Sequence, residues 1–181
     1  TTGNNTITLN SLSDETYSNC SITVTDSAGN SVTLNISSFV IDTTAPTVSS
    51  TSPSNGTITD DVNSFSATFS DVVDNTTLTT STFTVTDNSS NAVSGTVSSS
   101  DNTTAKNTTV TFTPSSITIG SYTAIVSNAV KDLAGNSLAQ NYSWSFEIKW
   151  VGTKQLGTSS AEEAYGVATD SSGNVYVTGY T

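Results

Sequence analysis

One six-residue segment of the chain occurs twice, and this repeat limits the folds that the sequence can adopt. Asp26-Ser-Ala-Gly-Asn-Ser31 returns as Asp132-Leu-Ala-Gly-Asn-Ser137, 106 positions later. A tyrosine opens an alternating stretch before each copy, and stretches of matching phase follow the copies from Ile36 and Tyr142. A repeat at domain-length spacing indicates tandem modules rather than one enzyme core. If a module holds about 105 residues, the first copy lacks roughly its first 60.

The charge balance excludes two classes of partner. The chain carries 4 basic and 15 acidic residues, the basic ones are all lysines, and the formal net charge is -11. Binding to the phosphates of a nucleic acid requires clustered Lys and Arg, and contact with anionic lipid headgroups requires the same. We therefore expect no nucleic-acid partner, and no membrane insertion because no long apolar run is present. The composition is typical of an exported β-protein and predicts an extracellular or cell-surface location.

The periodic segments of the chain alternate with a period of two, which predicts strands and no long helix. Threonines alternate with Val, Ile and Phe, as is typical of strands. The expected strands cover residues 6–9, 21–25, 32–41, 47–50, 64–69, 82–86, 92–98, 108–113, 121–127 and 142–148, and further strands are expected at 149–156, 165–169 and 174–180. Seven short strands between residues 47 and 148 predict a complete Ig-like β-sandwich, with a partial one before it.

The alternation also predicts which side chains face the interior of the complete sandwich. They come from five of its strands: Phe65, Ala67, Phe69, Phe83, Val85, Val110, Phe112, Ala124, Val126, Trp144 and Phe146. Tyr17 and Tyr122 each open an alternating stretch, and both resemble tyrosine corners, in which the phenol caps the turn into a core strand. That role predicts stability rather than ligand binding.

Longer motifs resemble two bacterial families. Pro53-Ser-Asn-Gly56, Ala67-Thr-Phe-Ser-Asp71 and Val130-Lys-Asp-Leu-Ala-Gly-Asn136 resemble the bacterial Ig-like module of surface-layer proteins and large adhesins. Gly166-Val-Ala-Thr-Asp170 and Gly173-Asn-Val-Tyr-Val-Thr-Gly-Tyr180 resemble a repeat of a bacterial β-propeller family. The resemblance implies three domains: residues 1–44 as the end of an Ig-like domain, 45–149 as a complete one, and 150–181 as a partial propeller repeat or a pair of donor strands.

The residue types present exclude several kinds of catalytic site. The chain has no histidine, so Ser-His-Asp and Cys-His systems and His-ligated zinc sites are excluded. Paired carboxylates could run glycoside hydrolysis, and the pairs are Asp60-Asp61, Asp71 with Asp74, and Glu162-Glu163. All of them fall in expected turns without the aromatic and polar groups that hold a sugar. We therefore expect no enzyme and no catalytic residues.

Calcium is the ligand that the loop aspartates favour. Ca²⁺ takes six to eight oxygens, mostly from carboxylates and carbonyls. In the adhesins that this chain resembles, aspartates at an Asp-x-Thr-Ala-Pro junction bind calcium, and the resemblance implies that role for Asp42. Further candidate ligands are Asp26 and Asp132 in the repeated segment, and Asp60 and Asp61 near the start of the second module. The alternative for Asp26 and Asp132 is that each only closes an Asx turn.

Two classes of function remain open at this stage. The first is an extracellular structural segment of a bacterial surface protein, such as a stalk, a fibre or a surface-layer component, whose partners are other copies of itself or neighbouring Ig-like repeats. In that class the tail of one copy completes the head of the next by strand donation, or the chain is an excerpt of a longer repeat protein. The second is an adhesin module that binds a glycan or a host-surface protein through loops at one end of the sandwich.

Overall fold

Strands make up nearly all the regular structure in the residues that the computed structural model describes, which are 6, 8, 10–60, 62–149, 163–171 and 174–180. A single 3-10 turn, η1 (Asn75–Thr77), interrupts them in this part of the chain. The predicted all-β fold class is therefore confirmed. The chain forms two compact units, Thr1–Trp150 and Val151–Thr181. No helix among the described residues is long and apolar enough to cross a membrane.

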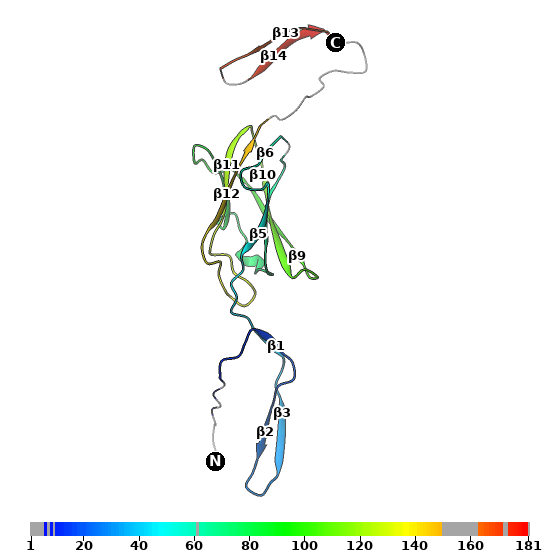
Figure 1. Ribbon diagram of the computed structural model, residues 1–181, viewed down its shortest axis with the longest axis vertical. Helices are drawn as coiled ribbons and strands as arrows, with labels where there is room; N and C mark the ends of the chain where they lie inside the picture. Colours follow the sequence, from blue (N-terminus) through cyan, green and yellow to red (C-terminus); the bar gives the residue numbers. More distant parts are fainter. Residues whose placement is uncertain are drawn as a thin grey trace. The chain divides into compact units, whose positions relative to one another are not determined.

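Two four-stranded sheets form the sandwich of the first unit (Figure 1). The first has the order β5-β7-β10-β9 and the second β6-β12-β11-β8. Their bounds are β5 (Val48–Ser52), β6 (Ile58–Thr59), β7 (Phe65–Phe69), β8 (Phe83–Asp87), β9 (Gly95–Asn102), β10 (Asn107–Pro114), β11 (Gly120–Val126) and β12 (Tyr142–Ile148). The seven strands predicted for this span are all present, with ends shifted by up to a few residues.

Strand β6 is a correction to the predicted seven-stranded antiparallel sandwich. It holds two residues, too few to show an alternating pattern in the sequence. It runs parallel to the last strand, with Ile58 opposite Glu147 and Thr59 opposite Ile148. The backbone N–H groups of Glu147 and Lys149 donate to the carbonyls of Thr57 and Thr59, both at 2.9 Å. The extra strand therefore ties the beginning of the sandwich to its end.

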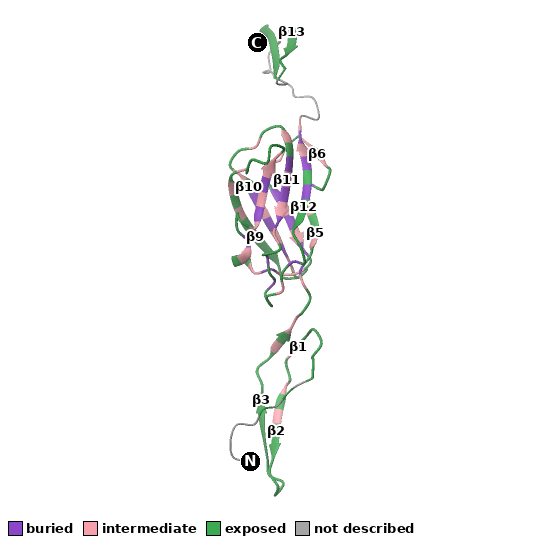
Figure 2. Ribbon diagram, turned by 90° about the vertical axis from the view of Figure 1, so that its left-hand side faces the viewer, coloured by how far each residue is buried: buried purple, intermediate pink, exposed green. Residues whose placement is uncertain are grey.

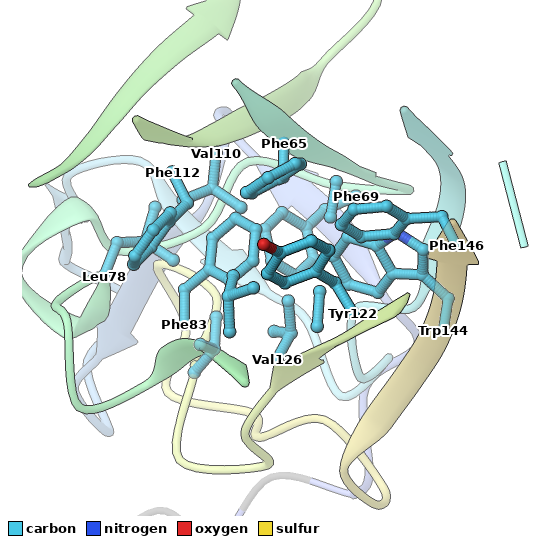
Figure 3. Close-up of a cluster of buried hydrophobic side chains, with 14 of the residues drawn as sticks. Phe65, Phe69, Leu78, Phe83, Val110, Phe112, Tyr122, Val126, Trp144 and Phe146 are labelled. Carbon is cyan, nitrogen blue, oxygen red and sulfur yellow. The ribbon is translucent and has the colours of Figure 1, made fainter. Parts of the chain in front are cut away.

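The core lies between the two sheets, as the alternation predicts. Figure 3 shows the aromatic side chains of both sheets directed toward one another. Every side chain predicted to face inward is at most 3% exposed, and Trp144 is 1% exposed. The ring centroids of Phe65 and Phe146 lie 4.7 Å apart, and those of Phe83 and Trp144 lie 5.7 Å apart. Burial of each such side chain stabilises the fold by roughly 1.5–3 kcal/mol.

Both predicted tyrosine corners are confirmed. The hydroxyl of Tyr122 donates to the carbonyl of Thr118 at 2.9 Å, and that of Tyr17 donates to the carbonyl of Ser13 at 3.1 Å. Each bond spans four residues and closes the turn before a strand.

Replacing Tyr122 with phenylalanine should lower the free energy of unfolding by about 0.5–1.5 kcal/mol, the usual net contribution of one hydrogen bond. The ring keeps its packing against Phe146, so the loss reports on the hydroxyl alone. Urea unfolding of the full chain measures it. Tyr142→Phe, at an exposed tyrosine of the same sheet, should change the value by less than about 0.5 kcal/mol. Equal losses for both variants would contradict the corner.

The chain before residue 42 forms two small antiparallel pairs. β1 (Glu15–Tyr17) pairs with β4 (Phe39–Ile41), and β2 (Ser21–Thr25) pairs with β3 (Ser31–Asn35). The prediction of one strand over residues 32–41 is wrong, because residues 36–38 break the run between two strands that have different partners. The strand predicted at 6–9 is not seen at residues 6 and 8, and residues 7 and 9 lie outside the described part.

The first of these pairs repeats a detail of the sandwich. Tyr17 lies opposite Phe39, as Tyr122 lies opposite Phe146, and both pairs of rings are stacked. Strands β1 and β4 therefore match β11 and β12. In the sandwich Phe65 of the facing sheet packs on this pair. In the first copy Val24, Val32, Leu34 and Val40 on β2, β3 and β4 stay exposed, and Figure 2 shows β2 and β3 mostly in green.

The described part of the second unit is a two-stranded hairpin of β13 (Glu163–Thr169) and β14 (Val175–Tyr180). This confirms the strands predicted at 165–169 and 174–180. Both faces of the hairpin are exposed, including the side chains of Tyr165, Tyr176 and Tyr180. Of the strand predicted at 149–156, residues 150–156 lie outside the described residues. The predicted domain boundaries at residues 44/45 and 149/150 stay predictions.

Candidate metal centre

The repeated Asp-x-Ala-Gly-Asn segment forms the same turn in both places. The backbone N–H of Asn136 donates to Oδ1 of Asp132 at 2.8 Å, and its Nδ2 donates to Oδ2 at 2.8 Å. Asn30 makes the same two bonds to Asp26, each at 2.9 Å. Gly29 and Gly135 have φ values of +90° and +96°, which glycine adopts without strain. Asp26 and Asp132 therefore each close an Asx turn.

Two further turns in the described part of the chain share this geometry. Asn91 binds Asp87 through its backbone N–H and its side-chain amide, and Asn174 binds Asp170 in the same way. In all four turns the asparagine follows the aspartate by four residues. Hydrogen bonds donated by the backbone and side-chain N–H groups of the asparagine stabilise the ionised form of the aspartate carboxylate. The side-chain amides of Asn30 and Asn91 therefore hold the pKa of Asp26 and of Asp87 below its usual value.

Three carboxylates converge at one end of the sandwich. Oxygens of Asp42, Asp71 and Asp132 all lie within 4.8 Å of one another. Asp42 follows β4, Asp71 lies two residues after β7, and Asp132 opens the repeated turn between β11 and β12. We call these three residues the metal centre.

Backbone contacts hold the three segments together. Nδ2 of Asn136 donates to the carbonyl of Asp42 at 3.0 Å, which fixes the linker against the repeated turn. Val73 and Asp132 form an isolated antiparallel bridge, which fixes the same turn against the segment after β7. The backbone N–H of Val72 donates to Oδ1 of Asp71 at 2.6 Å. The metal centre is therefore built by the fold and not by a single loop.

Of the calcium ligands predicted from the sequence, the structure brings Asp42 and Asp132 together. Asp26 lies in its own turn before β3 and is not in the group. Asp60 directly follows β6, which pairs with the last residues of β12, whereas Asp132 lies on the loop before β12. Asp60 and Asp132 therefore lie toward opposite ends of β12, and the structure does not bring Asp60 into the group. Asp61 lies outside the described residues.

Asp71 was not among the predicted calcium ligands. Its closeness to Asp74 in the sequence made the two acids a candidate catalytic pair. Asp74 instead caps the 3-10 turn: its Oδ1 accepts from the backbone N–H of Thr76 at 2.9 Å and from Oγ1 of Thr76 at 2.7 Å. Those bonds hold the pKa of Asp74 below its usual value, with the threonine hydroxyl as the largest cause. Asp71 therefore belongs to the metal centre, whereas Asp74 caps the 3-10 turn.

The donor set and the charge of the metal centre fit a hard divalent cation. Asp132 is 3% exposed, and Asp42 and Asp71 are half-buried. Within the described part of the chain the ion pair joins Lys149 and Glu147, so no lysine there balances the three acids. Three negative charges this close repel one another, and a bound cation offsets that repulsion. Carboxylate oxygens are ligands that Ca²⁺ prefers.

Comparison with known proteins supports the fold. The family model described as "Bacterial Ig-like domain" matches residues 42–148, and the model described as "Beta-propeller repeat" matches residues 151–181. No curated protein matches the chain.

Solved structures similar to the chain include PcoC, a methionine-rich copper resistance protein from Escherichia coli. It is 12% identical with a TM-score of 0.45, over 59% of this chain and all of PcoC. The bacterial S-layer protein SbsC is also similar. Its fragment rSbsC(31-844) is 20% identical with a TM-score of 0.42, over 74% of this chain and 19% of that one. The structure of the N-terminal part of SbsC is 20% identical with a TM-score of 0.44, over 75% of this chain and 33% of that one.

Proposed function

Because the chain belongs to the bacterial Ig-like domain family, we propose that it is an extracellular structural segment of a bacterial surface protein, without catalytic activity. The observation that carries this proposal is the tandem repeat. The same tyrosine corner, the same Asp–Asn turn and the same Tyr–Phe pair occur on both sides of the linker at residues 42–46. Modules that repeat along a chain extend it, as a stalk, a fibre or a surface layer requires.

The parallel pairing of β6 with β12 supports a load-bearing role. Pulling on residue 42 and on residue 149 draws these two strands in opposite directions along their length. The bonds between them then share the load, because none can open before the others. The N–H of Gly56 donates to the carbonyl of Ser145 at 2.7 Å, and the N–H of Ser145 donates to Oδ1 of Asn55 at 2.9 Å, in addition to the two bonds from Glu147 and Lys149.

Single-molecule stretching of the full chain tests this role. We expect one main event that releases on the order of 350 Å of chain, since about 105 residues extend by ~3.3–3.6 Å each. Asn55→Ala removes one bond of the β6–β12 contact and should lower the unfolding force. Asn88→Ala, in an exposed turn on another strand pair, is the control. A sandwich that opens gradually at low force, or equal effects of both variants, would count against the proposal.

We also propose that the metal centre binds Ca²⁺. Calorimetric titration of the full chain with CaCl₂ should show one site, and saturating Ca²⁺ should raise the melting temperature, because a ligand that binds only the folded state stabilises it. Asp71→Asn should abolish both effects. Asp26→Asn is the matched control, since Asp26 lies in a similar turn outside the metal centre. Heat of binding that survives Asp71→Asn would place the ion elsewhere.

Head-to-tail assembly by strand donation is a further part of the proposal. Val24, Val32, Leu34 and Val40 on β2, β3 and β4 are exposed, and so are the apolar side chains of β13 and β14, so a second copy offers strands that could cover them. Deleting residues 154–181 should then abolish polymerisation and leave residues 1–41 sensitive to protease, while residues 45–148 stay folded. Assembly of the truncated chain, or an intact monomer with a protected head, would contradict donation.

A groove beside the metal centre favours the alternative function, recognition of a glycan or a host protein. It has a volume of about 250 Å³ and is lined by Pro46, Val48, Leu138, Gln140 and Tyr142, among others. A half-exposed tyrosine beside a side-chain amide suits a sugar ring. A glycan array probed with the full chain tests this function: a saturable signal that Tyr142→Ala removes would support it, and a blank array would leave the structural role.

A further inference from the structure

Asp14 lies beside the linker that joins the two modules, although 29 residues separate it from Thr43. Its Oδ2 accepts from the backbone N–H of Thr43 at 3.0 Å and from Oγ1 of Thr44 at 2.8 Å. Its Oδ1 accepts from Oγ1 of Thr43 at 2.8 Å. These bonds hold the pKa of Asp14 below its usual value, with the backbone N–H of Thr43 as the largest cause. One carboxylate of the first module therefore holds both threonines of the linker.

The contacts of Asp14 continue into the metal centre. Oδ1 of Asp42 accepts from the backbone N–H of Thr44 at 3.0 Å, and the carbonyl of Asp42 accepts from Nδ2 of Asn136 at 3.0 Å. The same Nδ2 donates to Oδ2 of Asp132 at 2.8 Å. A continuous path of hydrogen bonds thus runs from Asp14 through the linker to the repeated turn of the second module.

The linker is held at its two ends, where Asn136 binds the carbonyl of Asp42 and Pro46 is buried, but Thr43 and Thr44 between them are exposed. Residues 42–46 lie outside any strand, so they contribute no bonds to a sheet ladder. Holding such residues in one conformation has an entropic cost, and charge-assisted hydrogen bonds are stronger than neutral ones and can offset it. The carboxylate of Asp14 accepts three such bonds from Thr43 and Thr44, the two residues that directly follow Asp42.

We propose that Asp14 is a clasp: it fixes the conformation of residues 42–44 and so positions the carboxylate of Asp42 toward Asp71 and Asp132. The part of this inference that concerns an ion rests on the proposed calcium site. Coupling between two sites is reciprocal. A cation held by the metal centre therefore stabilises the clasp, and the clasp raises the affinity for the cation.

Asp14→Asn in the full chain tests the clasp. An amide keeps the shape of the side chain but removes the charge and one acceptor. We expect the backbone amides of Thr43 and Thr44 to exchange with solvent at least several-fold faster, as measured by NMR without added metal. The affinity for Ca²⁺ alone, measured by calorimetry, should fall on the order of tenfold, within the range of coupled sites. Asp26→Asn is the control and should change neither value.

The two readouts separate the clasp from the ion. If the unmodified chain binds no Ca²⁺ while Asp14→Asn still speeds exchange at Thr43 and Thr44, the clasp stands and the calcium proposal fails. If Asp14→Asn changes neither exchange nor affinity, the clasp is overturned. Should Asp14→Asn unfold the first module, the pair Thr43→Val and Thr44→Val removes the donated hydroxyls from the other side. That variant must speed exchange at both linker amides, and protection equal to that of the unmodified chain would overturn the clasp.

Discussion

Replacing Trp144 with alanine should lower the free energy of unfolding by about 3–5 kcal/mol, the usual cost of removing a large core side chain. Trp144 lies on the last strand of the sandwich, is 1% exposed, and contacts the ring of Phe83 on β8, across the intervening strand β11 of the same sheet. The cavity would open in the middle of the aromatic core shown in Figure 3. Urea unfolding of the full chain, followed by far-UV circular dichroism, measures the loss.

Trp144→Phe is the informative companion variant. Nε1 of Trp144 is buried and has no hydrogen-bond partner among the described residues. A buried donor without a partner costs about 1–3 kcal/mol. Phenylalanine removes that donor while keeping a ring in the core, so it should destabilise the sandwich much less than alanine does. A loss below about 1 kcal/mol for Trp144→Ala would mean that this strand is not part of the core.

Replacing Gly95 with alanine should be the second largest change, with a loss of about 1–3 kcal/mol or more. A Cβ at this position would lie 2.5 Å from the carbonyl oxygen of Thr113 and 2.6 Å from Cε1 of Phe112. The first of these atoms belongs to the backbone of the paired strand and the second to a buried ring. Neither can move without disturbing the pairing of β9 with β10 or the core.

Ser94→Ala provides the control for Gly95→Ala. Ser94 is the preceding residue and is exposed, so the change should stay within about 0.5 kcal/mol. Thermal unfolding of both variants beside the unmodified chain gives the comparison. If Gly95→Ala is as stable as Ser94→Ala, the close approach of β9 to Phe112 is not present in solution.

The core could be predicted because it depends on a local pattern. Phe65, Ala67 and Phe69 alternate with polar residues, and a strand directs alternate side chains to one face. Two residues cannot show that alternation, so β6 could not be found in the sequence. Residues 36–38 show the opposite effect. Ile36 continues the alternation of β3 and donates its backbone N–H to the carbonyl of Cys20, but the strand ends at Asn35 and the next strand has another partner.

Two of the three residues of the metal centre could be predicted from the sequence, because only those two lie in recognisable local motifs. Asp42 and Asp132 carry local signals, a linker motif and a repeated turn. Asp71 has neither, since only the packing of the segment after β7 against the turn after β11 brings it within reach. Asp60 is close to the linker in the sequence but lies at the other end of β12 from the metal centre. Strand β5 carries the chain along the sandwich between Asp42 and Asp60.

The pairing of β6 with β12 also sets the order in which the sandwich can fold. It joins Ile58 to Glu147, near the two ends of the module, and contacts between residues so far apart in sequence form slowly. The last strand also contributes Trp144 and Phe146 to the core. A chain that emerges from a ribosome or a translocation pore with its N-terminus first therefore cannot close the module until residue 148 is out. Until then the aromatic faces of the other strands stay exposed. A chaperone that binds such faces can act during that interval.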